Sequence, residues 1–115
     1  MSQAIPDRKP VIIDLLQLLA SEERQLAYEQ NVPHVDITAE LVCMWFDDQY
    51  HPTDALFASS FSADELAALA EFHQFYDQRN DHLPESKGTV RTWLADHSWR
   101  AIMGKAQETL TRIAP

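Results

Sequence analysis

Apolar and polar positions alternate with the spacing of α-helices along most of this chain. From residue 10 to residue 30, leucines and isoleucines keep helical spacing, and polar side chains occupy the opposite side. Pro10 suits the first position of a helix because its ring fixes φ near the helical value. Ser21, which two glutamates follow, can instead start a new helix. The pattern therefore predicts either one helix over 10–30, continuous or kinked, or two helices that meet near Ser21.

A second helix is predicted over residues 39–49, after a connector over 32–37 and with Thr38 as its N-terminal cap. The middle of this helix, residues 41–46, is apolar on every side. Periodicity alone would also allow a buried strand here, but the polar residues at both ends keep helical spacing. We expect this segment to be the most buried helix of the domain.

The clearest local signal is a capping box at the start of a long helix, which is predicted over residues 63–82. The Ser62 hydroxyl can accept from the backbone N–H of Glu65, whose carboxylate can accept in turn from the Ser62 N–H. Phe61 and Leu66 occupy the two positions of a hydrophobic staple, which fixes the angle at which the chain enters the helix.

Three further segments complete the helical pattern. Thr89 can cap a short helix, and Asp96 or Ser98 can cap the last one. The turn just before the capping box can also be helical. These segments cover residues 54–58, 90–95 and 99–113.

Glycine is scarce, with two residues, and no Asn-Gly or Asp-Gly pair offers a tight hairpin turn. This argues against an all-β fold. We predict an all-α fold, a compact bundle of four to five helices with short loops. The length corresponds to a single domain over residues 1–115, and residues 1–9 are predicted to form a flexible N-terminal segment.

Acidic side chains are concentrated in the first two thirds of the chain. Residues 10–77 carry thirteen carboxylates and one basic side chain, Arg24, whereas residues 78–115 carry six basic and four acidic side chains. The net charge of the whole chain is −9. Such a field repels nucleic acids and anionic membranes, and it speeds encounter with basic partners. We therefore expect neither nucleic-acid binding nor membrane binding.

The single cysteine, Cys43, excludes an internal disulfide and any multi-cysteine metal site, and it suits a reducing compartment. Its apolar neighbours also predict an unreactive thiol. The apolar run over 11–20 follows two basic residues, as in a signal peptide, but Asp14 and Gln17 interrupt it. The run is too short to span a bilayer. We expect a soluble, cytoplasmic protein.

The sequence has no motif typical of catalysis or of phosphate binding, so we expect a non-enzymatic protein without a cofactor. Acidic residues and histidines do stand at spacings that metals use, with Asp48 and His51 at i, i+3 and His73 and Asp77 at i, i+4. Two-metal bundles use Glu-x-x-His twice, and that motif does not occur. A frayed helix end and a surface ion pair explain both spacings without a metal.

The segment from Trp45 to Phe61 mixes aromatic residues with carboxylates. Aromatic anchors surrounded by charge are typical of protein-binding surfaces, so we predict a surface in which acids steer a basic partner and aromatic side chains anchor it. In the alternative, Phe57 and Phe61 fold back onto the bundle. The candidate partner-binding residues are Asp47, Asp48, Tyr50, His51, Asp54, Phe57, Glu71, Phe75, Asp77 and Asp81.

In general character the chain is similar to small acidic proteins that neutralise basic toxins or nucleases, such as bacterial immunity proteins. This similarity lies in composition alone and carries over no residue. It implies a non-enzymatic module that neutralises or sequesters a basic protein partner. Two alternatives stay open, namely a metal-binding helical bundle that uses the Asp/His cluster near 47–54 and a structural homodimer formed through apolar surface of the first helix.

Overall fold

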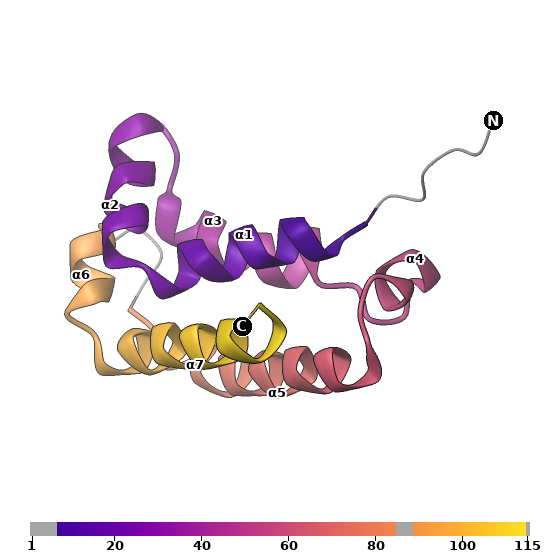
Figure 1. Ribbon diagram of the computed structural model, residues 1–115. Helices are drawn as coiled ribbons and strands as arrows, with labels where there is room; N and C mark the ends of the chain where they lie inside the picture. Colours follow the sequence, from indigo (N-terminus) through magenta and orange to yellow (C-terminus); the bar gives the residue numbers. More distant parts are fainter. Residues whose placement is uncertain (1–6, 85–88, 115) are drawn as a thin grey trace.

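The helical periodicity of the sequence gives rise to an all-α fold, which Figure 1 shows as a computed structural model. The structure describes residues 7–84 and 89–114, and no residue of these ranges lies in a strand. The elements are α1 (Lys9–Ala20), α2 (Glu22–Asn31), α3 (Ile37–Cys43), the π-helix η1 (Met44–Gln49), α4 (Ala55–Ser59), α5 (Ala63–Asn80), α6 (Val90–Leu94) and α7 (His97–Ile113). The predicted fold class is confirmed, although the helices outnumber the four to five expected.

α7 lies at the centre of the packing, with α1 on one side and α5 on the other (Figure 1). All three helices contribute side chains with no exposed surface, among them Leu16, Leu69 and Ile102. Full burial of one such side chain stabilises the fold by about 1.5–3 kcal/mol. α2 and α6 lie near one end of this arrangement, and α4 lies near the other. Among the described helices, none is long and apolar enough to cross a membrane.

A single residue, Ser21, separates α1 from α2. Its backbone is extended, at φ −115° and ψ 115°, which ends the first helix. Its hydroxyl then accepts a hydrogen bond of 3.1 Å from the backbone N–H of Arg24 and so caps the second helix. Of the two alternatives for residues 10–30, the structure therefore contains the pair of helices.

The angle between α1 and α2 is held by Gln25, a fully buried polar side chain. Its amide nitrogen donates to the carbonyl oxygens of Leu18, at 3.1 Å, and Leu19, at 3.0 Å, near the end of α1. Its amide oxygen accepts from the Trp99 indole nitrogen of α7 at 3.0 Å. One side chain thus joins three helices and satisfies a buried indole N–H.

α2 is also fastened to α6, by a carboxylate. One oxygen of Glu29 accepts a hydrogen bond of 2.9 Å from the backbone N–H of Val90, at the first position of α6. A negative charge there favours the helix because the first backbone N–H groups have no partner within it.

α3 begins two residues earlier than predicted. Asp36 is its cap and accepts from the backbone N–H of Ala39 at 3.2 Å, so Thr38 lies inside the helix and the prediction of Thr38 as the cap is wrong. The Thr38 hydroxyl donates instead to the Asp36 carboxylate at 2.7 Å. Asp36 is the cap because its carboxylate can accept from both the Ala39 N–H and the Thr38 hydroxyl.

The apolar run of residues 41–46 is buried on one side only. Leu41 and Trp45 are fully buried, whereas Val42, Cys43, Met44 and Phe46 are half-buried. The second half of the run belongs to η1, where the backbone N–H of Tyr50 donates to the Trp45 carbonyl oxygen, five residues back, at 3.1 Å. The predicted helix over 39–49 is therefore an α-helix that continues as a π-helix.

The predicted capping signals of the later helices are present. At α5, the Ser62 hydroxyl accepts from the Glu65 N–H at 3.1 Å, and the Glu65 carboxylate accepts from the Ser62 N–H at 2.8 Å. Thr89 caps α6. Of the two candidates for the last helix, Asp96 is the cap, so α7 begins two residues before the predicted start at residue 99.

The last two residues of the segment that was expected to be flexible, residues 1–9, contact the bundle. The Arg8 backbone N–H donates to the Ser60 hydroxyl at 2.9 Å, and Lys9 begins α1 and forms an ion pair with Glu65. Residues 1–6 lie outside the described part of the chain.

The ion pair between Lys9 and Glu65 is expected to contribute stability that depends on pH. The hydrogen bond from Lys9, and then that from the Ser62 backbone, holds the pKa of Glu65 below its ordinary value. The contribution is therefore present above about pH 4.3, the pKa of a free glutamate, and is lost as the pH falls through the lowered pKa.

Lys9→Met should thus lower the free energy of unfolding at neutral pH by about 0.5–1 kcal/mol, because both partners are partly exposed. At a pH below the lowered pKa of Glu65, the variant and the parent protein should be nearly equal, because the carboxyl group is then protonated in both the folded and the unfolded chain. Urea denaturation at the two pH values measures this. Arg24→Met is the control for loss of one positive charge, and an equal effect of both substitutions would contradict the specific pairing.

Candidate functional site

The π-helix places a stack of aromatic rings against α5. The Tyr50 ring lies 4.7 Å from that of Trp45, at an interplanar angle of 10°, and 4.9 Å from that of His73, at 27°. The Trp45 indole nitrogen donates to His73 Nδ1 at 3.2 Å, so in the neutral imidazole the proton resides on Nε2. The stack leaves Tyr50 9% exposed.

Phe57 continues this cluster from α4. Its side chain is 2% exposed, and its ring lies 5.6 Å from Tyr50 and 5.0 Å from Phe61. The expectation that Tyr50 or Phe57 presents an exposed anchor is therefore wrong. Both rings lie in the core, because the chain leaves the bundle over the exposed residues 51–56 and returns to it at Phe57.

Three other candidate residues are engaged within the fold. The Asp54 carboxylate caps α4 by accepting from the Leu56 N–H at 2.9 Å. Glu71 pairs with Arg112, and the hydrogen bond from that guanidinium lowers the pKa of the Glu71 carboxyl. The Phe75 ring is covered by the Arg79 guanidinium, whose carbon lies 3.6 Å from the ring centre.

The weak metal candidates are not brought together. His73 faces Trp45 and Tyr50, whereas the exposed His51 donates from Nε2 to the Asp48 carbonyl oxygen at 3.0 Å. Asp77 is exposed on α5. Among the described residues, no group of three or more histidine, cysteine or acidic side chains could hold a metal ion.

Asp47, Asp48, Asp77 and Asp81 are exposed, as a steering role requires. They belong to two separate places in the fold. Asp77 and Asp81 lie on and just after α5, whereas Asp47 and Asp48 lie on η1.

A groove runs between α1 and the segment formed by α3 and η1, next to Asp48. It encloses about 350 Å³, and none of its described lining residues is basic. We call it the acidic groove. Its apolar part consists of Val11, Leu15, Leu18 and Met44, and its polar part consists of Asp14, Glu40, Asp48 and Gln49. Val11 is 38% exposed and is one of three exposed large aliphatic side chains among the described residues, with Val35 and Leu56.

The carboxylates of the acidic groove lack the neutralising contacts that the fold gives to others. Six of the thirteen carboxylates in residues 10–77 cap a helix or form an ion pair, and these are Glu22, Glu29, Asp36, Asp54, Glu65 and Glu71. The remaining seven have no such contact among the described residues. Three of them, Asp14, Glu40 and Asp48, line the groove.

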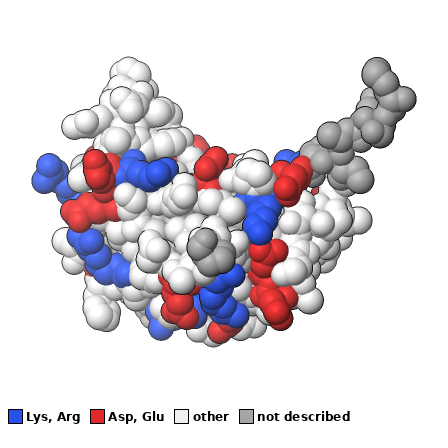
Figure 2. All heavy atoms as spheres, viewed as in Figure 1, with Lys and Arg blue, Asp and Glu red and all other residues white. Residues whose placement is uncertain are grey.

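The face over α7 has a different charge pattern. Figure 2 shows Lys and Arg side chains next to Asp and Glu side chains over this face, so neither sign dominates. Glu71 and Glu108 both lie near Lys105 there, at 4.0 and 3.2 Å. The face over α7 therefore lacks the unbalanced negative charge of the acidic groove.

The lining residues Asp14 and Glu40 were not among the predicted site residues. In the sequence, Asp14 belongs to the polar side of one helix and Glu40 to the start of another. They share a groove because α1 packs against η1, which is a tertiary contact. The exposure of Val11, one turn before Asp14, marks the groove in the structure. The spacing of residues in the sequence does not reveal this exposure.

Cys43 lies between two acidic neighbours and is expected to react slowly. Burial raises the pKa of its thiol, and a hydrogen bond to the Asp47 carboxylate and the charge of Glu40 raise it further. Because the thiolate is the reactive form, alkylation by iodoacetamide should be several-fold slower than in the urea-unfolded chain. Asp47→Asn should speed the reaction of the folded protein, whereas the distant Asp77→Asn should not. Equal rates in the folded and unfolded chain would contradict this expectation.

Comparison of the chain with models of protein families, with curated proteins and with solved structures finds no match.

Proposed function

We propose that this protein is a non-enzymatic binding module whose acidic groove takes a basic, amphipathic segment of a partner protein. The observation that carries the proposal is the coincidence of two properties at one place. Three unneutralised carboxylates, Asp14, Glu40 and Asp48, stand beside an apolar surface that includes the exposed Val11. Sequestration or neutralisation of that partner, as the compositional similarity to immunity proteins implies, is part of the proposal.

The apolar surface of the acidic groove contributes affinity for the partner, and its carboxylates contribute fast encounter and selectivity. Apolar side chains of the partner that enter the groove contribute about 1.5–3 kcal/mol each when fully buried. Lys or Arg residues on the polar face of the same segment meet the carboxylates, which speeds encounter and selects against acidic sequences. A helix that lays its apolar face into a groove between two helices presents both kinds of side chain with a period of three to four residues.

A defined peptide pair tests the proposal. The probe is a synthetic helical peptide with leucines on one face and lysines on the other, and its control is a scrambled peptide of identical composition. Isothermal calorimetry should show that the amphipathic peptide binds at least about tenfold more tightly, because only it presents both faces together. Its affinity should fall as salt rises, since charges on the surface are screened over about 8 Å at physiological ionic strength.

Two variants with the same change in net charge locate the site. Asp14→Asn, Glu40→Gln and Asp48→Asn together should abolish the preference for the amphipathic peptide. Glu23→Gln, Asp77→Asn and Asp81→Asn together should leave it, since these exposed carboxylates lie on or beside α2 and α5. If both triple variants weakened peptide binding equally, the binding would be general charge attraction and not recognition by the groove. If the native protein did not bind the amphipathic peptide, the proposal would be overturned.

Self-association through α1 is the second candidate, and the exposed Val11 favours it. Two copies that met groove to groove would bring their carboxylates together, and like charges in contact oppose such a dimer. We therefore expect a monomer in light scattering at neutral pH. A dimer that Val11→Asp dissociates would favour the homodimer instead.

A further inference from the structure

A pocket of about 260 Å³ lies between α2, α6 and the first turns of α7. Two of its three charged lining residues are arginines, so we call it the basic pocket. It shares no lining residue with the acidic groove. Its charged part consists of Glu22, Arg91 and Arg100, and its apolar part consists of Leu26, Leu94 and Ala95.

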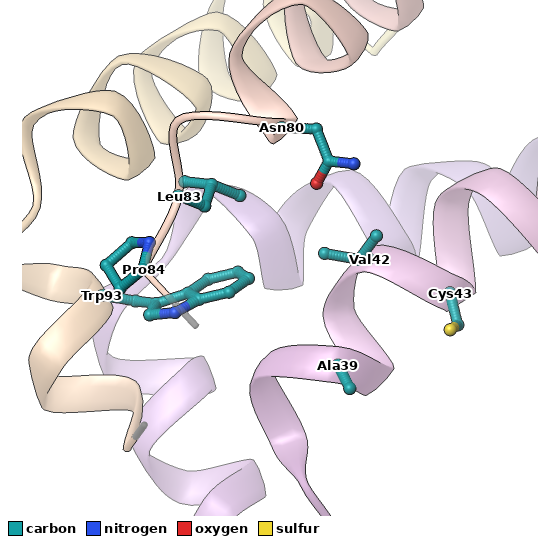
Figure 3. Close-up of a pocket in the computed structure, with 7 residues that line it drawn as sticks. All are labelled: Ala39, Val42, Cys43, Asn80, Leu83, Pro84 and Trp93. Carbon is teal, nitrogen blue, oxygen red and sulfur yellow. The ribbon is translucent and has the colours of Figure 1, made fainter. Parts of the chain in front are cut away.

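The charge of the basic pocket distinguishes it from two other cavities of the protein. The acidic groove has no basic residue in its described lining, and the cavity between α3, the end of α5 and α6 has no charged one (Figure 3). The basic pocket has a formal charge of +1, from two arginines and one glutamate. It can attract an anion in spite of the net charge of −9, because salt screens distant charges over about 8 Å at physiological ionic strength.

Arg100 is held in place by the backbone of α6. Its Nε donates to the carbonyl oxygen of Leu94 at 2.6 Å, which satisfies a carbonyl at the end of that helix. Its Nη1 and Nη2 each lie 3.4 Å from one carboxylate oxygen of Glu22. Strong charge-assisted hydrogen bonds are shorter, at about 2.7–2.9 Å. The Glu22 side chain is 53% exposed, so a carboxylate of a ligand can displace it from the guanidinium.

Arg91 adds a second positive charge that the fold leaves unpaired. Its side chain is exposed, and among the described residues its guanidinium forms neither an ion pair nor a hydrogen bond. Guanidinium groups bind carboxylates with two parallel hydrogen bonds. A carboxylate in the pocket can therefore bind Arg100 in this way while the charge of Arg91 attracts it.

The apolar lining and the net charge of the pocket indicate which anion suits it. Leu26 and Leu94 offer apolar surface beside the arginines. A cavity of about 150 Å³ can hold benzene, so the basic pocket has room for one six-membered ring. A monoanion makes the pocket neutral, whereas a dianion such as phosphate leaves it negative next to Glu22. An organic monocarboxylate therefore fits better than an inorganic anion.

We propose that the basic pocket binds a small organic monocarboxylate with an apolar body of about one ring, and that Glu22 competes with this ligand for Arg100. The apolar body packs against Leu26. The displaced Glu22 carboxylate stays at the first position of α2, where the unpaired backbone N–H groups favour a negative charge. Because this pocket and the acidic groove are separate, either proposal can fail without the other.

Three probes separate the charge from the apolar contact. Cyclohexanecarboxylate has both, cyclohexanecarboxamide has the ring without the charge, and acetate has the charge without the ring. Titrations at neutral pH and constant ionic strength are followed by proton–nitrogen correlation spectra. Cyclohexanecarboxylate should shift the backbone signals of Leu26 and Leu94 in a saturable way. It should bind about fivefold more tightly than the amide, the factor that corresponds to a well-formed exposed ion pair, and also more tightly than acetate.

Two pairs of variants with matched changes in charge locate the site. Glu22→Gln removes the competing carboxylate and should tighten the binding of cyclohexanecarboxylate about threefold, whereas Glu23→Gln, outside the pocket, should change it little. Arg91→Gln should weaken the binding about threefold, whereas Arg24→Gln, on the exposed side of α2, should not. All four side chains are exposed, so the variants should fold.

Several results would overturn the proposal. Equal affinities for the carboxylate and the amide would show that the arginines do not bind the ligand, and equal effects of Glu22→Gln and Glu23→Gln would show that Glu22 does not compete. Inorganic phosphate that bound as tightly as cyclohexanecarboxylate would show that the apolar lining does not contribute. Absence of a saturable shift up to the solubility of the carboxylate would show that the pocket does not bind this class of ligand.

Discussion

Replacing Gln25 by alanine is expected to lower the free energy of unfolding by about 3 kcal/mol. The substitution removes the acceptor of the buried Trp99 indole N–H and the donor to the carbonyl oxygens of Leu18 and Leu19. Unsatisfied buried groups cost more than the lost hydrogen bonds themselves, since water does not replace the missing partner. Urea denaturation followed by circular dichroism measures the loss.

A residue of the same type in the same helix provides the control. Gln30 is exposed on α2, and Gln30→Ala should change the free energy of unfolding by less than about 0.5 kcal/mol. In a Trp99→Phe background, the indole donor is already absent, so Gln25→Ala should cost at least about 1 kcal/mol less than in the parent protein. If Gln25→Ala and Gln30→Ala lowered the free energy of unfolding equally, Gln25 would not join the helices as described. The same would follow if the effects of Gln25→Ala and Trp99→Phe on the free energy of unfolding were strictly additive.

Replacing Trp45 by alanine is expected to cost about 3–5 kcal/mol, the range for deletion of a fully buried large aromatic side chain. Trp45 has no exposed surface, it stacks on Tyr50, and its ring meets that of Phe72 edge-on at 4.8 Å. Trp45→Phe should cost about 1–2 kcal/mol, because it keeps one ring and loses the hydrogen bond to His73. Thermal or urea denaturation of the two variants gives these values.

The neighbouring Phe46 is the control that tests whether the destabilisation depends on burial or only on loss of an aromatic side chain. It lies in the same π-helix and is half-buried, with its ring 4.9 Å from that of Tyr76. Phe46→Ala should therefore cost less than Trp45→Ala. If the two alanine variants were equally destabilised, the aromatic stack around Tyr50 would not be the part of η1 that stabilises the fold.

Helix ends were the most predictable part of the fold, because capping is local. Ser62, Thr89 and Asp96 each accept from a backbone N–H three residues ahead, and a pattern of neighbouring residue types indicates such contacts. The same local logic selected Thr38 at the start of α3, whereas Asp36, two residues earlier, is the cap. The π-helix was not predicted, since two of its rings, those of Trp45 and Phe46, contact His73 of α5, far along the chain.

The negative charge of the candidate site could be predicted from the sequence, but its location in the fold could not. The acidic excess is a matter of composition, whereas its neutralisation depends on distant contacts such as Glu71 with Arg112. The aromatic residues after Trp45 resembled anchors because they alternate with acids, but burial of Tyr50 and Phe57 is decided by the return of that segment onto the bundle. The acidic groove exists only once α1 and η1 are packed together.

The one-residue junction at Ser21 has a consequence for how this fold tolerates changes in length. Because Ser21 is extended, a residue inserted there would change both the distance and the angle between α1 and α2. Gln25 would then leave the end of α1, and Glu29 would leave Val90 at the start of α6. The length of the junction therefore determines how α2 is oriented against both α1 and α6. Insertions are better accommodated in the exposed connector over residues 33–35, before Asp36 caps α3.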